Sequence, residues 1–198
     1  MIEDEKANVS RRTVIASAAL VPVTAIKSAA QAIAPAVFAP EQRRTLEAFL
    51  GRLIPEDDNG PGAVGCGAVN YFEQQLAGDL ANEKAAIVGG LAALEVYSRK
   101  AYGAAFPDLT PDKQDEVLTA MQNNRAEGFT GAVGFFNRMR RLTLEGTFGD
   151  PYYGGNRNFA GWDLIRYPGV RLAVSAEDQK MASVKPAHVS AWGAKYGH

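Results

Sequence analysis

Residues 41–54 read EQRRTLEAFLGRLI, and this stretch decides the class of fold. Its apolar side chains recur three or four positions apart and form one stripe along a helix: Leu46, Phe49, Leu50, Leu53 and Ile54. Pro40 suits the first turn of such a helix, and Pro55 ends the run. We therefore predict an amphipathic helix whose apolar face packs into a core.

Helical spacing continues in four further segments, at residues 66–77, 81–104, from Thr110 onward, and at 129–145. Thr110, Pro111 and Asp112 form a typical helix start, with a cap, a proline at the first position and an acid in the first turn. The expected buried positions are Val69, Phe72, Leu76, Val117, Leu118, Met121, Phe135, Phe136, Met139 and Leu142. No alternating strand pattern or internal repeat is present. We expect an all-α domain of about five helices, followed by a long irregular loop rich in glycine and aromatic residues and by a C-terminal tail.

Two glycines interrupt the third of these segments. Gly89 and Gly90 lower its helix propensity, and this predicts either a kink or a close packing of helices at that point.

The composition limits the function. The chain has 198 residues, which suits one domain with a tail. Its 21 Lys and Arg against 22 Asp and Glu leave no basic excess with which to displace the counterions of a nucleic acid. The single cysteine excludes an internal disulfide framework, and the two histidines, His188 and His198, leave few ligands for a metal. We therefore expect no nucleic-acid partner and no metal site.

Residues 1–34 have the layout of an export signal. A polar start ends in two arginines, residues 13–26 are apolar and uncharged, and small residues follow. The apolar run is too short to span a bilayer, which takes about 20 residues. Ser10, Arg11 and Arg12 stand directly before it and resemble the twin-arginine motif, which exports folded proteins. We expect a periplasmic protein; cleavage after Ala32 or after Ala34 stays open, and an uncleaved, disordered or anchoring N-terminus is the alternative.

Several local patterns lack the context of the functional motif that they match. Residues 60–65 fit G-x-G-x-x-G, but a helix and an acidic turn precede them instead of a strand, so we interpret them as a helix connection. The acidic residues 56–58 lack the spaced ligands of a calcium loop, and the carboxylates between 112 and 127 fit a solvated helix face. Cys66 has no histidine near it in the sequence, which favours a buried thiol over a nucleophile.

Residues 146–169, GTFGDPYYGGNRNFAGWDLIRYPG, hold six of the eighteen aromatic residues and six glycines. Glycine permits unusual backbone conformations and aromatic rings bring a large contact area, so this composition predicts a fixed, convoluted loop. The loop either closes the core of its own domain or offers a contact surface to a second protein, and both can hold at once. The backbone amides of such a loop need partners, which side chains can supply: Asn156, Arg157, Asn158 and Asp163. We assign Arg138 to charge pairing on a helix face, with Glu145 and Asp163 as the acidic partners, and Arg157 to the contact surface.

Three sequence blocks make the chain resemble the gluconate 2-dehydrogenase subunit 3 family. The blocks are Leu53-Ile54-Pro55 with the acidic loop and Pro61-Gly62-Ala63, the run FNRMRRLTLEG at 136–146, and DPYYGGN at 150–156 with Gly161-Trp162 and Tyr167-Pro168-Gly169. The resemblance implies a non-catalytic, exported subunit that stabilises a large FAD-dependent sugar dehydrogenase and carries it across the membrane. It implies that FAD lies in the large subunit, that a cytochrome c subunit often takes the electrons, and that this chain holds no cofactor and no membrane span.

On this reading the chain has a signal at 1–34, a helical accessory domain at 35–170 and a tail at 171–198. The expected partner contacts lie in the glycine-rich and aromatic segment: Tyr152, Tyr153, Gly154, Gly155, Asn156, Arg157, Trp162 and Tyr167. The substrate stays open between gluconate, glucose and a glucoside oxidised at position 3. The alternative is a free-standing periplasmic carbohydrate-binding domain, in which the aromatic rings would stack on sugar rings.

Overall fold

Helix α1 (Pro40–Leu53) is the element around which the other long helices pack. The computed structural model describes residues 36–171, 173, 176, 179–180 and 188–193, so the predicted export signal lies outside the described residues. Leu46, Phe49 and Leu50 have no exposed surface, as predicted. The ring of Phe49 lies 6.0–6.3 Å from three other core rings, those of Phe106, Phe135 and Phe136. These three members of the predicted stripe therefore form the centre of the core, whereas Leu53 and Ile54, at the end of the stripe, are half-buried.

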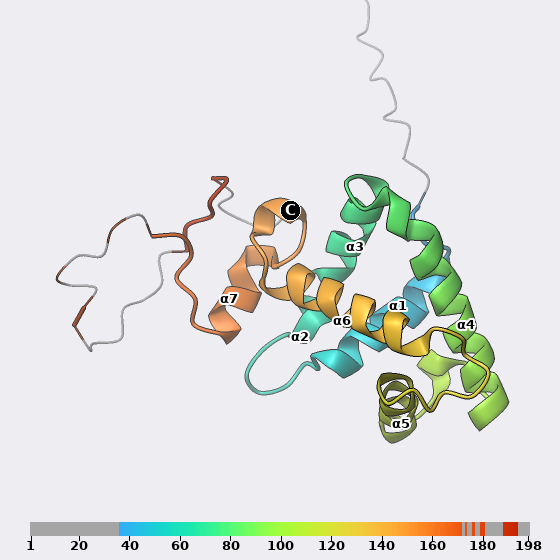
Figure 1. Cartoon of the computed structure of the whole chain (residues 1–198). Coiled ribbons are helices and arrows are strands. Elements are labelled where there is room, and N and C mark those ends of the chain that lie inside the picture. Colours follow the sequence, from blue (N-terminus) through green and yellow to red (C-terminus); the bar gives the residue numbers. More distant parts are fainter. Residues whose placement is uncertain (1–35, 172, 174–175, 177–178, 181–187, 194–198) are drawn as a thin grey trace, which may run out of the picture. The chain divides into compact units, whose positions relative to one another are not determined.

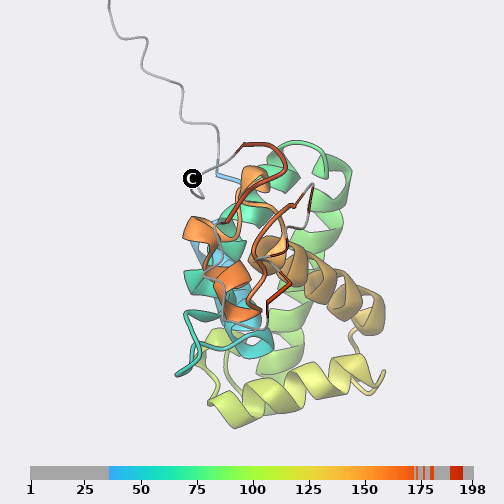
Figure 2. The ribbon, with the colours of Figure 1, turned by 90° about the vertical axis from the view of Figure 1, so that its left-hand side faces the viewer.

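The all-α prediction is confirmed. The four further long helices are α3 (Ala68–Ala77), α4 (Lys84–Tyr102), α5 (Pro111–Gln122) and α6 (Ala132–Phe148). All ten side chains that were expected to be buried in the second, fourth and fifth helical segments are buried. Figure 1 shows α6 running between α4 on one side and α7 on the other, and Figure 2 looks onto the side that carries α7.

Short helical elements join the long ones. They are α2 (Gly62–Gly65), α7 (Ala160–Leu164) and the 3₁₀ turns η1 (Ala81–Glu83), η2 (Phe106–Asp108), η3 (Pro151–Tyr153) and η4 (Arg157–Phe159). The part of the chain that the structure describes contains no β-strand, only isolated bridges between Asp57 and Gly60 and between Gly169 and Val189. Residues 60–65 thus turn into α2 after helix α1, which fits a helix connection.

Close helix packing accounts for one of the two glycines in α4. A Cβ atom on Gly90 would lie 2.1 Å from a ring carbon of Phe135 on α6, whereas a Cβ on Gly89 would meet nothing within 4 Å. Helix α4 runs through both positions as one element. Of the two alternatives that the sequence left open, the structure has the close approach.

Ion pairs tie the exposed faces of the helices together. The guanidinium of Arg52 on α1 donates to both carboxylate oxygens of Asp115 on α5, at 2.8 and 2.5 Å, and these hydrogen bonds lower the pKa of Asp115. Arg138 and Arg141 on α6 both pair with Glu83, at 3.1 and 3.3 Å. The assignment of Arg138 to charge pairing is therefore confirmed, but its partner is Glu83 and not Glu145 or Asp163.

Candidate functional site

The segment after α6, residues 149–169, is here called the aromatic loop, and it is organised around the side chain of Asn156. This side chain has no exposed surface. Its Nδ2 donates to the carbonyl of Gly149, and its Oδ1 accepts from the N–H of Gly161, both over 2.8 Å. The N–H of Asn156 itself donates to the carbonyl of Gly146 on α6 over 2.8 Å. One buried amide thus satisfies backbone groups that a ladder or long helix would otherwise pair.

Glycines let the aromatic loop lie directly against α6. A Cβ atom on Gly155 would lie 2.0 Å from the carbonyl oxygen of Gly146, and one on Gly161 would lie 1.8 Å from that of Thr147. Real Cβ atoms do not approach so closely, because the repulsion rises steeply at such distances. The loop therefore contacts the helix backbone through positions that no larger residue can occupy.

The buried rings of the aromatic loop form a small core of their own. The indole of Trp162 is 3% exposed, and its Nε1 donates to the carbonyl of Phe148 over 2.8 Å. The rings of Phe159 and Tyr167 lie 5.2 and 4.9 Å from it. This satisfies the single polar group of the indole while its faces stay packed. The loop is fixed by its own contacts, as the sequence composition predicted.

The described end of the chain, residues 188–193, packs on the aromatic loop and is here called the tail strap. The imidazole of His188 stacks on Phe159 with ring centres 5.0 Å apart, and its Nε2 lies 2.8 Å from Oδ1 of Asp163. Further along, Trp192 lies against Tyr152 with ring centres 5.6 Å apart. His188 therefore has a packing role in this structure, while His198 lies outside the described residues.

The structure divides the eight predicted contact residues into two groups. Four are buried and serve the packing of the loop itself: Gly154, Gly155, Asn156 and Trp162. Four are exposed and available to another molecule: Tyr152, Tyr153, Arg157 and Tyr167. A contact surface on this loop would therefore consist of the second group, held in place by the first.

Sequence reasoning missed one prominent member of this surface. Trp192 is 61% exposed, more than any other residue of its size on the loop or the strap. Its neighbour Val189 is 52% exposed and pairs with the loop through the N–H of Val170, which donates to the Val189 carbonyl over 2.8 Å. No local sequence pattern predicts the contact of Trp192 with Tyr152, because the two positions are about 40 residues apart in the sequence.

Cys66 is not poised for chemistry. The residue is fully buried at the end of α2, and burial raises the pKa of its thiol to about 11. Its carbonyl oxygen accepts from the N–H of Arg157 over 2.7 Å, which fastens the aromatic loop to the start of α3. The prediction of a buried thiol is confirmed.

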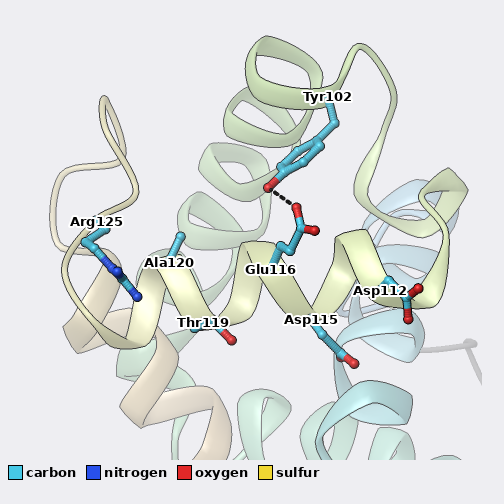
Figure 3. Close-up of a pocket in the computed structure, with 7 residues that line it drawn as sticks. All are labelled: Tyr102, Asp112, Asp115, Glu116, Thr119, Ala120 and Arg125. Atoms are coloured by element: carbon cyan, nitrogen blue, oxygen red, sulfur yellow. Dashed lines mark hydrogen bonds between the residues drawn. The ribbon is translucent and has the colours of Figure 1, made fainter.

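A surface hollow of about 520 Å³ lies between the end of α4 and α5 (Figure 3). Three carboxylates line it, those of Asp112, Asp115 and Glu116, together with Arg125 at its far end. The hydroxyl of Tyr102 donates to Glu116 over 3.0 Å, and burial together with this carboxylate raises the pKa of the Tyr102 phenol.

Neither a metal site nor a membrane-spanning helix is found among the residues that the structure covers. Among them, no group of three or more histidine, cysteine, aspartate or glutamate side chains is placed to hold a metal ion. No helix in the same part of the chain is both long enough and apolar enough to cross a bilayer.

Comparison with known proteins gives one match. The sequence model of the family described as gluconate 2-dehydrogenase subunit 3 matches residues 40–169, more than half of the chain. The chain belongs to this family. Neither the curated proteins nor the solved structures that were searched give a significant match.

Membership of the subunit 3 family implies a multi-subunit dehydrogenase complex and is consistent with an accessory role for this chain. The matched region begins with α1 and ends with the aromatic loop, at Gly169. Two of the three blocks that carried the resemblance, 136–146 and 150–156, meet in space at the end of α6, where the carbonyl of Gly146 accepts from the N–H of Asn156. Gly146 also approaches Ala68 and Tyr71 of α3 closely. These contacts within the family region build the frame that supports the exposed tyrosines.

Proposed function

We propose that this chain is the non-catalytic small subunit of a periplasmic FAD-dependent dehydrogenase that oxidises a sugar, a sugar acid or a glycoside. It binds the folded catalytic subunit, stabilises it and supplies the export signal that carries both proteins to the periplasm. FAD belongs to the catalytic subunit, and in some complexes a cytochrome c subunit takes the electrons. The observation that carries the proposal is the match of residues 40–169 to a family of dehydrogenase subunits.

The geometry of the aromatic loop supports a binding role. The loop is rigid, because its backbone and its buried rings are fixed by internal contacts, yet Tyr152 is 55% and Tyr167 40% exposed. Tyrosine rings that are already held in place lose little conformational entropy when a partner covers them. A partner that binds only the folded state adds to the stability of both chains by mass action.

The first test is an affinity purification of the full chain from its native host through a C-terminal tag. We expect a large protein to co-elute, to show the absorption bands of a flavin and to reduce an artificial electron acceptor when gluconate, glucose or a glucoside is added. Elution of this chain alone, without a flavin, would contradict the proposal. Calorimetry of that single chain with sugars would then test the carbohydrate-binding alternative.

The second test concerns export. Replacing Arg11 and Arg12 together by lysine should leave both this chain and the catalytic subunit in the cytoplasm, because the catalytic subunit would have no signal of its own. The two proteins are followed by immunoblots of periplasmic and cytoplasmic fractions. If the catalytic subunit still reaches the periplasm, co-export is excluded, but the proposal that the two proteins form a complex is not.

A further inference from the structure

The tail strap, residues 188–193, is attached to the aromatic loop by specific polar contacts. Asp150, which opens the block DPYYGGN, accepts at Oδ1 from the N–H of Tyr152 over 3.0 Å and from the hydroxyl of Ser190 over 2.7 Å. Its Oδ2 accepts from the N–H of Ala191 over 2.8 Å. One carboxylate therefore holds a residue of the loop and two residues of the strap in a single arrangement.

This arrangement places apolar side chains of the strap beside those of the loop. The rings of Tyr152 and Tyr153 lie 5.3 Å apart, and Trp192 continues the group at 5.6 Å from Tyr152. Of the nine large apolar residues that are exposed in the described part of the chain, six lie on the loop and the strap: Tyr152, Tyr153, Ile165, Tyr167, Val189 and Trp192. Such a concentration marks an interaction surface.

The chemistry of this surface fits a protein better than a sugar. A sugar site needs free polar groups beside the rings, but Asp150 and Ser190, the polar side chains next to Tyr152 and Trp192, already bond to each other and to the backbone. Arg157 and Arg166 are exposed residues of the loop, and their guanidinium groups have no hydrogen bond or ion pair with any other residue that the structure describes. Exposed aromatic residues together with arginines are typical of a protein interface, and the positive charges call for carboxylates on the opposing surface.

We propose that the tail strap is the second half of the docking surface for the catalytic subunit, with Trp192 as its principal contact. This inference rests on the proposed function, since the occupant is the catalytic flavoprotein, which presents an apolar patch bordered by carboxylates. The family match ends at residue 169, so the strap lies outside the matched region.

The experiment compares the affinity of the catalytic subunit for the mature chain and for four variants. Trp192→Ala removes the proposed contact, and a chain that ends at residue 187 removes the strap. Ser190→Ala removes one of the bonds that position it. Val96→Ala is the matched control, since Val96 is an equally exposed apolar residue, 68% exposed, on α4 at the opposite side of α6 from α7. Circular dichroism and thermal unfolding of each free variant check that it is folded.

We expect Trp192→Ala to raise the dissociation constant about 10-fold or more, as is typical when a tryptophan is removed from the centre of an interface. The shortened chain should lose at least as much affinity, Ser190→Ala should lose less, and Val96→Ala should bind like the unaltered chain. If the shortened chain does not fold, the affinities of Trp192→Ala and Ser190→Ala test the inference.

Two results overturn the inference and can be told apart. In the first, the unaltered chain binds the catalytic subunit, and Trp192→Ala and the shortened chain bind it equally well or more tightly. The strap would then make no contact with the partner or would compete with it, and the proposed function would still hold. Failure of the unaltered chain to bind the catalytic subunit would remove the proposed function, and the inference with it.

Discussion

At the scale of single residues, the least replaceable side chain of the candidate site is one that no partner can touch. Asn156 is fully buried and has a backbone φ of 45°, in the left-handed region that asparagine tolerates better than most residues. It bonds to groups on both sides of the turn, at Gly149 and Gly161. The exposed tyrosines keep their positions because this amide holds the backbone between them.

Replacing Asn156 by alanine should therefore destabilise the protein strongly. A partly buried carbonyl and a buried N–H would lose their partners, and the total cost should be about 2–5 kcal/mol in the free energy of unfolding. Asn158→Ala is the control, because Asn158 also has a positive φ, of 55°, but is exposed, and its change should cost about 1 kcal/mol or less. Urea unfolding followed by circular dichroism measures both. Equal losses for the two variants would show that the conformation matters and the buried hydrogen bonds do not.

Sequence reasoning named Asn156 in two roles, and the structure confirms the first of them: Asn156 was one of the side chains expected to satisfy backbone groups of the loop, and it was also predicted to be a partner contact. Sequence reasoning placed this residue among the partner contacts because the block DPYYGGN stands out as a unit. The pattern does not distinguish the residues that face outward, such as Tyr152, from those that face the loop's own interior. That distinction depends on where the backbone turns, and the turn is set by contacts with α6 that a local pattern does not contain.

At the scale of secondary-structure elements, the long helices were predictable and the short ones were not. The predicted apolar positions of the long helices follow helical spacing, and the structure buries all of them except Leu53 and Ile54, which are half-buried. Helices α2 and α7 have four and five residues, which is little more than one turn and too short to show a period. The tail strap is held by side-chain contacts between distant positions, so it also leaves no periodic signal.

Replacing each of two adjacent glycines of α4 by alanine should change the stability of the protein in opposite directions. Gly89→Ala adds a methyl group in open space and should stabilise the protein by about 0.5–1 kcal/mol through helix propensity. Gly90→Ala drives a methyl group into Phe135, whose ring is packed against Phe49 and Phe129, and should destabilise it by about 1–3 kcal/mol.

The difference between the midpoints of urea unfolding of the two variants gives the result directly, because their intrinsic propensity terms are the same. Each alanine is measured against the unaltered chain under identical conditions. Stabilisation by both substitutions would mean that α4 and α6 lie farther apart than the structure has them. The effect of each glycine on stability would then come from its low helix propensity alone.

At the scale of the whole molecule, one buried residue, Cys66, links the helical core to the candidate binding surface. Cys66 lies between α2 and α3, and its carbonyl holds the aromatic loop through Arg157. The residue has no exposed surface, so a reagent reaches the sulfur only when part of the structure opens or the whole unit unfolds. The accessibility of this single thiol therefore reports which part of the molecule opens first.

We expect Cys66 to react at least about 100-fold more slowly with a thiol reagent at pH 8 in the native protein than in urea. With a pKa of about 11, only about one thiol in a thousand is ionised at that pH, whereas an exposed cysteine is ionised to about a quarter. The sign follows from the buried state: burial disfavours the thiolate, so the native rate rises as the pH approaches 11. A native rate close to that of free glutathione would contradict the burial.

The dependence of this rate on urea then separates two ways of opening. If the rate rises steeply with urea below the unfolding midpoint, the thiol is exposed by unfolding of the whole unit. If urea changes it little and Asn156→Ala accelerates it, the loop opens by itself while the helices stay folded. In the second case the catalytic subunit, by covering the loop, should slow the labelling of Cys66 as it saturates, because binding to the closed state lowers the open population by mass action. Such protection, lost in the Trp192→Ala variant, would link the thiol, the aromatic loop and the tail strap in one equilibrium.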